Sequence, residues 1–141
     1  MKVEDSFKKY AKFLENLTIE DVPKLSNFAT EDILFVDPFH RVKGLKNMTQ
    51  IFTNLFKKVS NIAFKIDDYA VRGSVVYYQW TLTGYLSGNP WRVVGITQLA
   101  FNKNNLITEQ KEYWDAASQF YERIPIIGAL LRYFRRRISN Q

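Results

Sequence analysis

Hydrophobic side chains recur at helical spacing in three segments before residue 60, separated by polar residues on the opposite face. The first stripe predicts an amphipathic helix over about residues 5–16, and the second predicts a shorter helix that ends before an apolar, strand-like run at Ile33–Val36. The third and broadest stripe follows Gly44. The stripes consist of Phe7, Tyr10, Phe13, Leu14 and Leu17; of Val22, Leu25 and Phe28; and of Leu45, Met48, Ile51, Phe52, Leu55, Phe56 and Val59.

From Ile62 the period changes from 3.6 to 2, which indicates β-structure. Breaks short enough for hairpins separate the strands, so we expect an antiparallel meander. Helices followed by such a sheet are typical of an α+β fold, and long strands twist, so helices on the concave side would enclose a cone. The four predicted strands span residues 62–72, 74–86, 91–102 and 106–115.

Alternation along these strands predicts which side chains share the face under the helices. The more apolar set includes two polar residues, Thr97 and Glu112. The opposite face also carries apolar residues, among them Val94, Ile96 and Ala100, which favours sheet-to-sheet packing with a second copy. We therefore predict a homodimer. The inward set comprises Tyr78, Trp80, Leu82, Leu99, Phe101 and Trp114.

After Asp115 the period is helical again, with a short helix over 116–123 and a second that starts at Pro125. We predict a domain over residues 1–120 and an amphipathic basic helix within 121–141. This helix has the profile of one that lies on an anionic membrane or docks on an acidic partner; alternatively, it packs on the domain or across a dimer. Its apolar stripe is Ile127, Leu130, Leu131, Phe134 and Ile138, and its arginines are Arg132, Arg135, Arg136 and Arg137.

The length of 141 residues and the composition, 46% hydrophobic and 24% charged, predict one globular domain. The net charge of +6 is concentrated in the carboxyl-terminal arginines, so no basic face for nucleic acid is expected elsewhere. The first residues lack the apolar core of a signal peptide, and no apolar run approaches a membrane span, so we expect a cytoplasmic protein.

The absence of cysteine excludes disulfides, thiolate zinc ligands and a thiol nucleophile. A single histidine argues against a metal site, and the sequence predicts no cofactor. In contrast, an aromatic content of 16% exceeds what a minimal core needs, so some rings are expected to line a cavity.

The segment Ile33–Gly44 holds the principal candidate for chemistry. Its apolar strand ends in Asp37-Pro38, followed by the only histidine, His40. At the rim of an apolar cavity, Asp37 is a candidate proton-transfer group, and His40 a candidate partner. The alternative is structural, because Asp-Pro steps open turns in which the Asp side chain binds local backbone.

These features together resemble the NTF2-like superfamily, in particular its SnoaL-like and ketosteroid isomerase-like branch, over about residues 5–120. The most specific motifs are Val36-Asp37-Pro38-Phe39 with Gly44 beyond, and Glu112-Tyr113-Trp114-Asp115. The resemblance implies a dimeric α+β cone with a pocket between the sheet and the helices. It also implies that Asp37 stands where ketosteroid isomerases place the carboxylate that shuttles a proton.

The resemblance also marks departures from those families. Phe13 and Thr97 stand where the isomerase has hydrogen-bond donors for the substrate oxygen, so ketosteroid isomerase activity itself is not expected. Glu112 matches a carboxylate of related epoxide hydrolases, but the accompanying Asp and Arg pattern is incomplete. In SnoaL-like cyclases a nearby acid acts as base, which fits Glu112 or Asp115; Asp115 is alternatively a helix cap.

The sequence therefore predicts a binder of a small hydrophobic molecule, with Asp37 as the base of an isomerase, cyclase or hydrolase reaction assisted by His40 or Glu112. The alternative is a non-catalytic interaction module that docks through its basic carboxyl-terminal helix. The residues predicted to line the ligand pocket are Tyr10, Phe13, Phe52, Phe56, Tyr78, Trp80, Thr97, Leu99 and Trp114.

Overall fold

A computed structural model describes residues 2–120 and 125–139, and the element order agrees closely with the hydrophobic periodicity. Gly44 adopts a φ of 108° immediately before the second α-helix, a backbone conformation that glycine takes without steric cost. The elements are α1 (Val3–Glu15), η1 (Ile19–Asn27), β1 (Ala29–Val36), β2 (Arg41–Lys43), α2 (Leu45–Lys58), β3 (Val59–Arg72), β4 (Val75–Leu86), β5 (Asn89–Phe101), β6 (Ile107–Tyr113), α3 (Ala116–Gln119) and α4 (Pro125–Ser139).

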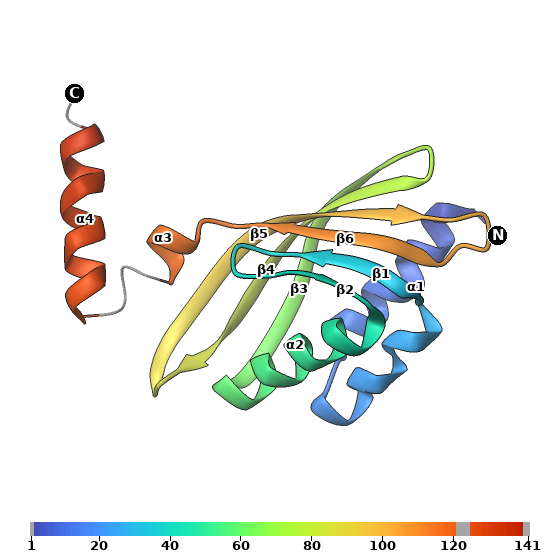
Figure 1. The fold of residues 1–141 in the computed structure, drawn as a ribbon, viewed down its shortest axis with the longest axis horizontal. Coiled ribbons are helices and arrows are strands. Elements are labelled where there is room, and N and C mark those ends of the chain that lie inside the picture. The colour runs from blue at the N-terminus through green and yellow to red at the C-terminus, as the bar shows by residue number, and fades with distance from the viewer. Residues whose placement is uncertain (1, 121–124, 140–141) are drawn as a thin grey trace.

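The described strands form one curved six-stranded sheet in the order β2-β1-β6-β5-β4-β3. Helices α1 and α2 and the 3₁₀-helix η1 lie on one side of it, and the long strands β3, β4 and β5 bend around them (Figure 1). The predicted antiparallel meander is confirmed for β3 to β6. The arrangement is the α+β cone expected from the sequence.

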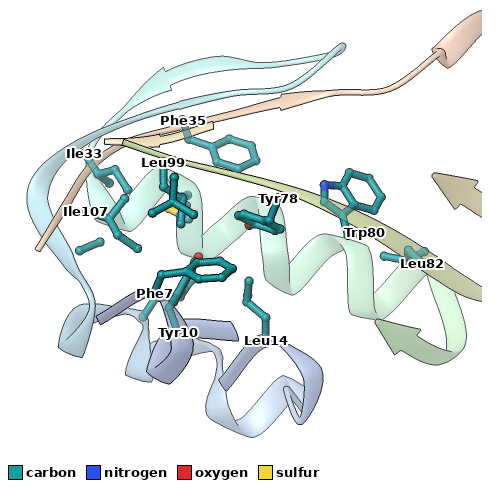
Figure 2. Close-up of a cluster of buried hydrophobic side chains, with 14 of the residues drawn as sticks. Phe7, Tyr10, Leu14, Ile33, Phe35, Tyr78, Trp80, Leu82, Leu99 and Ile107 are labelled. Atoms are coloured by element: carbon teal, nitrogen blue, oxygen red, sulfur yellow. The ribbon is translucent and has the colours of Figure 1, made fainter. Parts of the chain in front are cut away.

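The core lies between α1 and the inner face of the sheet. Figure 2 shows Tyr10 and Leu14 extending from α1 toward Tyr78 on β4. The predicted inward set is confirmed on the two central strands, because Tyr78, Trp80 and Leu82 of β4 and Thr97, Leu99 and Phe101 of β5 are all buried. Burial of these large side chains supplies most of the driving force for folding.

Two features of the sheet were not predicted. Strand β1 is longer than expected and pairs in parallel with β6, so that Phe35 lies beside Gln110 and Val36 beside Lys111. The short strand β2 closes a hairpin with β1. Parallel pairing joins strands that are distant along the chain, so local periodicity does not reveal it.

The second predicted helix is present as the 3₁₀-helix η1.

The carboxyl-terminal helices α3 and α4 follow the carboxyl-terminal end of β6 (Figure 1). Asp115 caps α3, because its carboxylate accepts the backbone N–H groups of Ala117 and Ser118 at 3.0 and 3.2 Å. The Ser118 hydroxyl, which donates to Asp115 Oδ2 at 2.6 Å, and then these backbone hydrogen bonds lower the pKa of Asp115. Helix α3 ends at Gln119 rather than at the predicted residue 123; residues 121–124 fall outside the described part. Helix α4 stands away from the sheet.

Candidate active site

A cavity of about 450 Å³ lies between α1, α2 and the concave face of the sheet. Its walls are largely apolar, with side chains such as Ile51 and Leu55 from α2 and Val59 and Ile62 from β3. Four polar or charged side chains, Asp37, His40, Gln110 and Glu112, meet at one end, and Glu15, Asn54 and Lys58 line other parts of it. The volume suits a small organic molecule, and the polar end would orient it.

Asp37 reaches this cavity from the turn between β1 and β2. Its Oδ1 accepts the backbone N–H groups of Phe39 at 2.8 Å and His40 at 2.7 Å. The His40 Nδ1 lies 2.9 Å from the same oxygen and 3.1 Å from Oδ2. The Asp37 side chain is 11% exposed and that of His40 is 42% exposed. Asp37 therefore has the turn geometry of the structural alternative and also a place in the cavity wall.

Glu112 enters the same cavity from β6. Burial, and then the negative charge of Asp37, raise the pKa of Glu112 from its ordinary value of 4.5 to about 8, although hydrogen bonds from Gln110 and Thr97 act in the opposite direction. Glu112 is therefore mostly protonated at neutral pH and available as a hydrogen-bond donor. The site thus contains two carboxyl groups whose environments differ.

A buried hydrogen-bond chain holds Glu112 in place. Tyr10 Oη donates to Gln110 Oε1 at 2.7 Å, and Gln110 Nε2 donates to Glu112 Oε2 at 3.3 Å. Burial raises the pKa of the Tyr10 hydroxyl far above its usual range, so this group remains a donor. Because Tyr10 binds the amide oxygen of Gln110, the amide nitrogen is directed toward Glu112.

A second chain supports the cavity wall on β4 and β5. Trp80 Nε1 donates to Thr97 Oγ1 at 2.8 Å, and Thr97 is paired across the strands with Glu112. Trp80 itself faces Gly95 on β5, where an added Cβ would lie 2.4 to 2.9 Å from three carbons of the indole ring. The lack of a side chain at Gly95 allows Trp80 to lie against β5.

Four aromatic side chains, named here the aromatic rim, border the cavity near His40: Phe39, Trp91, Trp114 and Phe120. Neighbouring rings pack at steep angles, with centroids 5.4 Å apart for Phe39 and Trp114, 5.1 Å for Phe39 and Phe120, 6.3 Å for Trp91 and Trp114, and 6.2 Å for Trp91 and Phe120. Gln119 fixes α3 beside β5, because its side-chain oxygen accepts the N–H of Val94 and its carbonyl accepts Trp91 Nε1.

Not every residue predicted for the pocket lines the cavity. Asp37, His40 and Glu112 do, together with Phe52, Phe56, Trp80 and Trp114. The other five predicted pocket residues, Tyr10, Phe13, Tyr78, Thr97 and Leu99, are absent from its lining. Tyr10, Tyr78, Thr97 and Leu99 are fully buried, and Phe13 packs against Phe28 at 4.7 Å between ring centroids. Side chains on the same face of the sheet can either line the cavity or lie buried in the core beside it, and the alternation of the sequence does not distinguish the two cases.

Several residues that line the cavity were not predicted from the sequence, among them Gln110, Phe39, Trp91 and Phe120. Gln110 was placed on the same side of β6 as Glu112 but was not singled out, and a polar residue on an apolar face was the available signal. Phe39 stood in the motif that contains Asp37 but was not predicted to line the cavity, and Trp91 and Phe120 had no such signal, because these three rings meet only through the fold. The carboxyl-terminal arginines lie on α4 and are not among the described residues that line the cavity.

The model of the SnoaL-like domain family matches residues 10–110, which include the second half of α1, the Asp37 turn and most of the sheet. The chain belongs to the SnoaL-like family. A search of curated proteins found no match.

The structure of this chain is also similar to solved structures of the same fold. The chain is similar to an LEH-like epoxide hydrolase from M. tuberculosis, with 16% identity, a TM-score of 0.67, and coverage of 84% of this chain and 86% of that one. A protein of ketosteroid isomerase-like fold from Catenulispora acidiphila, in complex with trimethylamine, has 17% identity, a TM-score of 0.69, and 81% and 88% coverage. A SnoaL-like polyketide cyclase, described as putative, from Jannaschia has 17% identity, a TM-score of 0.60, and 67% and 72% coverage. At these identities the likeness shows the NTF2-like fold.

The polar groups of the cavity differ from the epoxide hydrolase and ketosteroid isomerase patterns described above. Among the described lining residues there is no arginine, so the Arg of the epoxide hydrolase pattern has no counterpart in the cavity wall. In contrast, a carboxyl group occurs next to Thr97, because Glu112 is its cross-strand partner. This carboxyl group lies on β6, one strand away from Thr97 on β5.

Proposed function

We propose that this SnoaL-like protein binds a small hydrophobic carbonyl compound and transfers a proton on it, as an isomerase or cyclase would. Asp37 acts as the general base, and the protonated Glu112 acts as the hydrogen-bond donor to the substrate oxygen. The observation that carries this proposal is that both carboxyl groups line one apolar cavity, in which burial and the charge of Asp37 raise the pKa of Glu112 to about 8.

In the proposed reaction, the Asp37 carboxylate removes a proton from the carbon next to the substrate carbonyl. The electron pair of the broken C–H bond forms a C=C bond, and the carbonyl π electrons move onto oxygen. The Glu112 O–H hydrogen bond stabilises that developing charge. In an isomerase reaction, the substrate also carries a conjugated C=C bond, and Asp37 returns the proton to the far carbon of the dienolate as the carbonyl forms again. In a cyclase reaction, the enolate carbon attacks a second carbonyl of the same molecule, the first carbonyl forms again, and Asp37 gives its proton to the new alkoxide oxygen. Neither route requires a cofactor.

The hydrogen bonds of Asp37 support its role as base. Two backbone N–H groups and the His40 ring all contact Oδ1, whereas the one contact of Oδ2 among the described residues is the longer one to His40. Oδ2 is therefore the oxygen with more remaining acceptor capacity, and the turn fixes its direction. His40 acts in this scheme as a positioning residue for Asp37.

Glu112 provides the donor that Thr97 and Phe13 do not. Gln110 binds Oε2 of Glu112, which is the carbonyl-type oxygen when the acid is neutral, so the proton is carried by Oε1. Removing one such donor typically lowers the rate about 10²- to 10³-fold. In this proposal the hydrogen-bond donor, Glu112, comes from β6, whereas Thr97, at the position where the isomerase has its acidic donor, lies on β5.

The test combines a binding measurement with a proton-exchange measurement. Ligands from steroid enone, polyketide and fatty-acyl panels are first screened by thermal shift and native mass spectrometry; proton loss at the carbon next to the carbonyl of a bound ketone is then followed by NMR in D₂O. Asp37→Asn keeps an acceptor for the turn, so binding should persist while exchange falls by about 10²-fold or more. Glu112→Gln should also retain binding and slow exchange.

Matched controls are available on the same strands. Asp32→Asn on β1 is the control for Asp37→Asn, and Glu109→Gln on β6 is the control for Glu112→Gln. Neither Asp32 nor Glu109 lines the cavity. Both should exchange at the wild-type rate. If the wild type binds no ligand of the panels, or if Asp37→Asn exchanges as fast as Asp32→Asn, the proposed proton transfer is wrong.

A further inference from the structure

Helix α4 has an exposed apolar stripe, unlike α1 and α2, whose apolar faces pack on the core. Leu130, Phe134 and Ile138 recur at a spacing of four and are 55%, 52% and 70% exposed, and Tyr133 is 48% exposed. Figure 1 shows the helix standing apart from the sheet, beside α3. Amphipathic helices in globular proteins normally bury such a stripe, so this one is expected to have an external partner.

The charges of α4 restrict what that partner is. The helix carries Arg132, Arg135, Arg136 and Arg137 and has no acidic residue between Pro125 and Ser139. Two copies of α4 packed together would place eight arginines near one another without acids from either helix. Like charges at such an interface are unfavourable, which argues against self-pairing of the helix. A surface that is both anionic and apolar below its charges complements α4.

The position of α4 relative to the cavity is also informative. Helix α3, which contacts α4, is fixed beside β5 by Gln119, and Phe120 at its end belongs to the aromatic rim. Helix α4 thus lies on the side of the molecule where the aromatic rim borders the cavity. None of the helices in the described part of the chain is long and apolar enough to cross a bilayer, so binding parallel to its surface is the relevant geometry.

We propose that α4 binds the surface of an anionic lipid membrane, with Leu130, Phe134 and Ile138 inserted below the headgroups and the arginines facing the lipid phosphates. Tyr133, whose ring lies 6.0 Å from the Arg137 guanidinium carbon, occupies the boundary between the two regions. This docking places the aromatic rim near the lipid. It is independent of the proposed proton transfer and holds whether or not the cavity is catalytic.

The test is flotation of the full chain with phosphatidylcholine vesicles, with and without phosphatidylglycerol. Wild-type protein should float with the phosphatidylglycerol vesicles, float little with phosphatidylcholine alone, and lose binding as salt is added. The double variant Arg136→Gln/Arg137→Gln should bind more weakly, by about 5-fold for each arginine. The variant Phe134→Ser/Ile138→Ser should lose most partitioning, because it removes inserted apolar area.

The matched control is Lys46→Gln/Lys57→Gln on α2, which lowers the net charge by the same amount and should float like the wild type. Far-UV circular dichroism checks that each variant is folded. Equal flotation of the arginine variant and the lysine control would overturn the proposal, as would absence of wild-type flotation. If the Phe134→Ser/Ile138→Ser variant instead changes only the oligomeric state or binding to an acidic protein, α4 covers a protein surface and the proposal is also overturned.

Discussion

The Tyr10 hydroxyl and the Gln110 side chain, 100 residues apart in the sequence, share a buried hydrogen bond of 2.7 Å below the cavity. Both residues are 1% exposed, so neither group can replace its partner with bulk water. This bond orients the Gln110 amide, whose nitrogen in turn donates a hydrogen bond to Glu112. It connects the amino-terminal helix to the last strand and to the candidate acid.

Energetic coupling between these two residues is the first prediction. Tyr10→Phe leaves the Gln110 amide oxygen without its donor, and Gln110→Leu leaves the Tyr10 hydroxyl without its acceptor; each should lower the free energy of unfolding by about 1–3 kcal/mol. The double variant removes both groups and should cost less than the sum, by about 0.5–3 kcal/mol. Urea denaturation of the four proteins measures this, and strictly additive values would contradict the coupling.

The pH dependence of stability provides a second prediction. The pKa of Glu112 is raised from 4.5 to about 8 in the folded protein, so between these values the folded state holds a proton that the unfolded state has released. The contribution of Glu112 to the free energy of unfolding should therefore fall as the pH rises through this window, by up to about 1.4 kcal/mol per pH unit, and level off above it.

Glu112→Gln should lack this fall and be more stable than the wild type at the alkaline end of the window. Urea denaturation at both ends measures the difference, and Glu109→Gln on the same strand should keep the wild-type pH dependence. A Glu112→Gln profile parallel to that of the wild type would show that burial does not raise the pKa of Glu112.

A third prediction concerns the close approach of Trp80 to Gly95. Gly95→Ala places a methyl group where the indole now lies, so Trp80 must move and its 2.8 Å bond to Thr97 is lost. We expect a loss of about 1–3 kcal/mol in the free energy of unfolding and a changed near-UV circular dichroism spectrum. In a Trp80→Phe background the same substitution should cost less, because the smaller ring leaves more space; an equal cost in both backgrounds would place the strain elsewhere.

The homodimer expected from the sequence stays a prediction, and the outer face of the sheet indicates where to test it. Ile96 and Tyr113 face each other across β5 and β6 and are 49% and 58% exposed. Ile96→Lys would place like charges in a symmetric interface and should raise the dimer dissociation constant at least about 10-fold. Light scattering after size-exclusion chromatography measures this, and Ile19→Lys, an exposed isoleucine of η1, serves as the control. Unchanged dimers of Ile96→Lys would exclude this face.

Much of the fold was accessible from local patterns. The change of period near residue 60 located the helices and the meander, and alternation correctly assigned Tyr78, Trp80 and Leu99 to the inner face. Asp37 and Glu112 were recognisable as acids next to or on apolar strands. Alternation does not report depth, however. Thr97 on β5 is buried but does not line the cavity, and the same is true of Tyr10 on α1.

The sequence alone therefore determined the fold class, the inward faces of β4 and β5 and the presence of two candidate carboxyl groups, because these depend on periodicity over a few neighbouring residues. Only the tertiary structure decided that β1 pairs in parallel with β6, that Gln110 links Tyr10 to Glu112, and that both acids share one cavity. These relationships join segments up to 100 residues apart, and their distances and burial are set by packing of the whole domain.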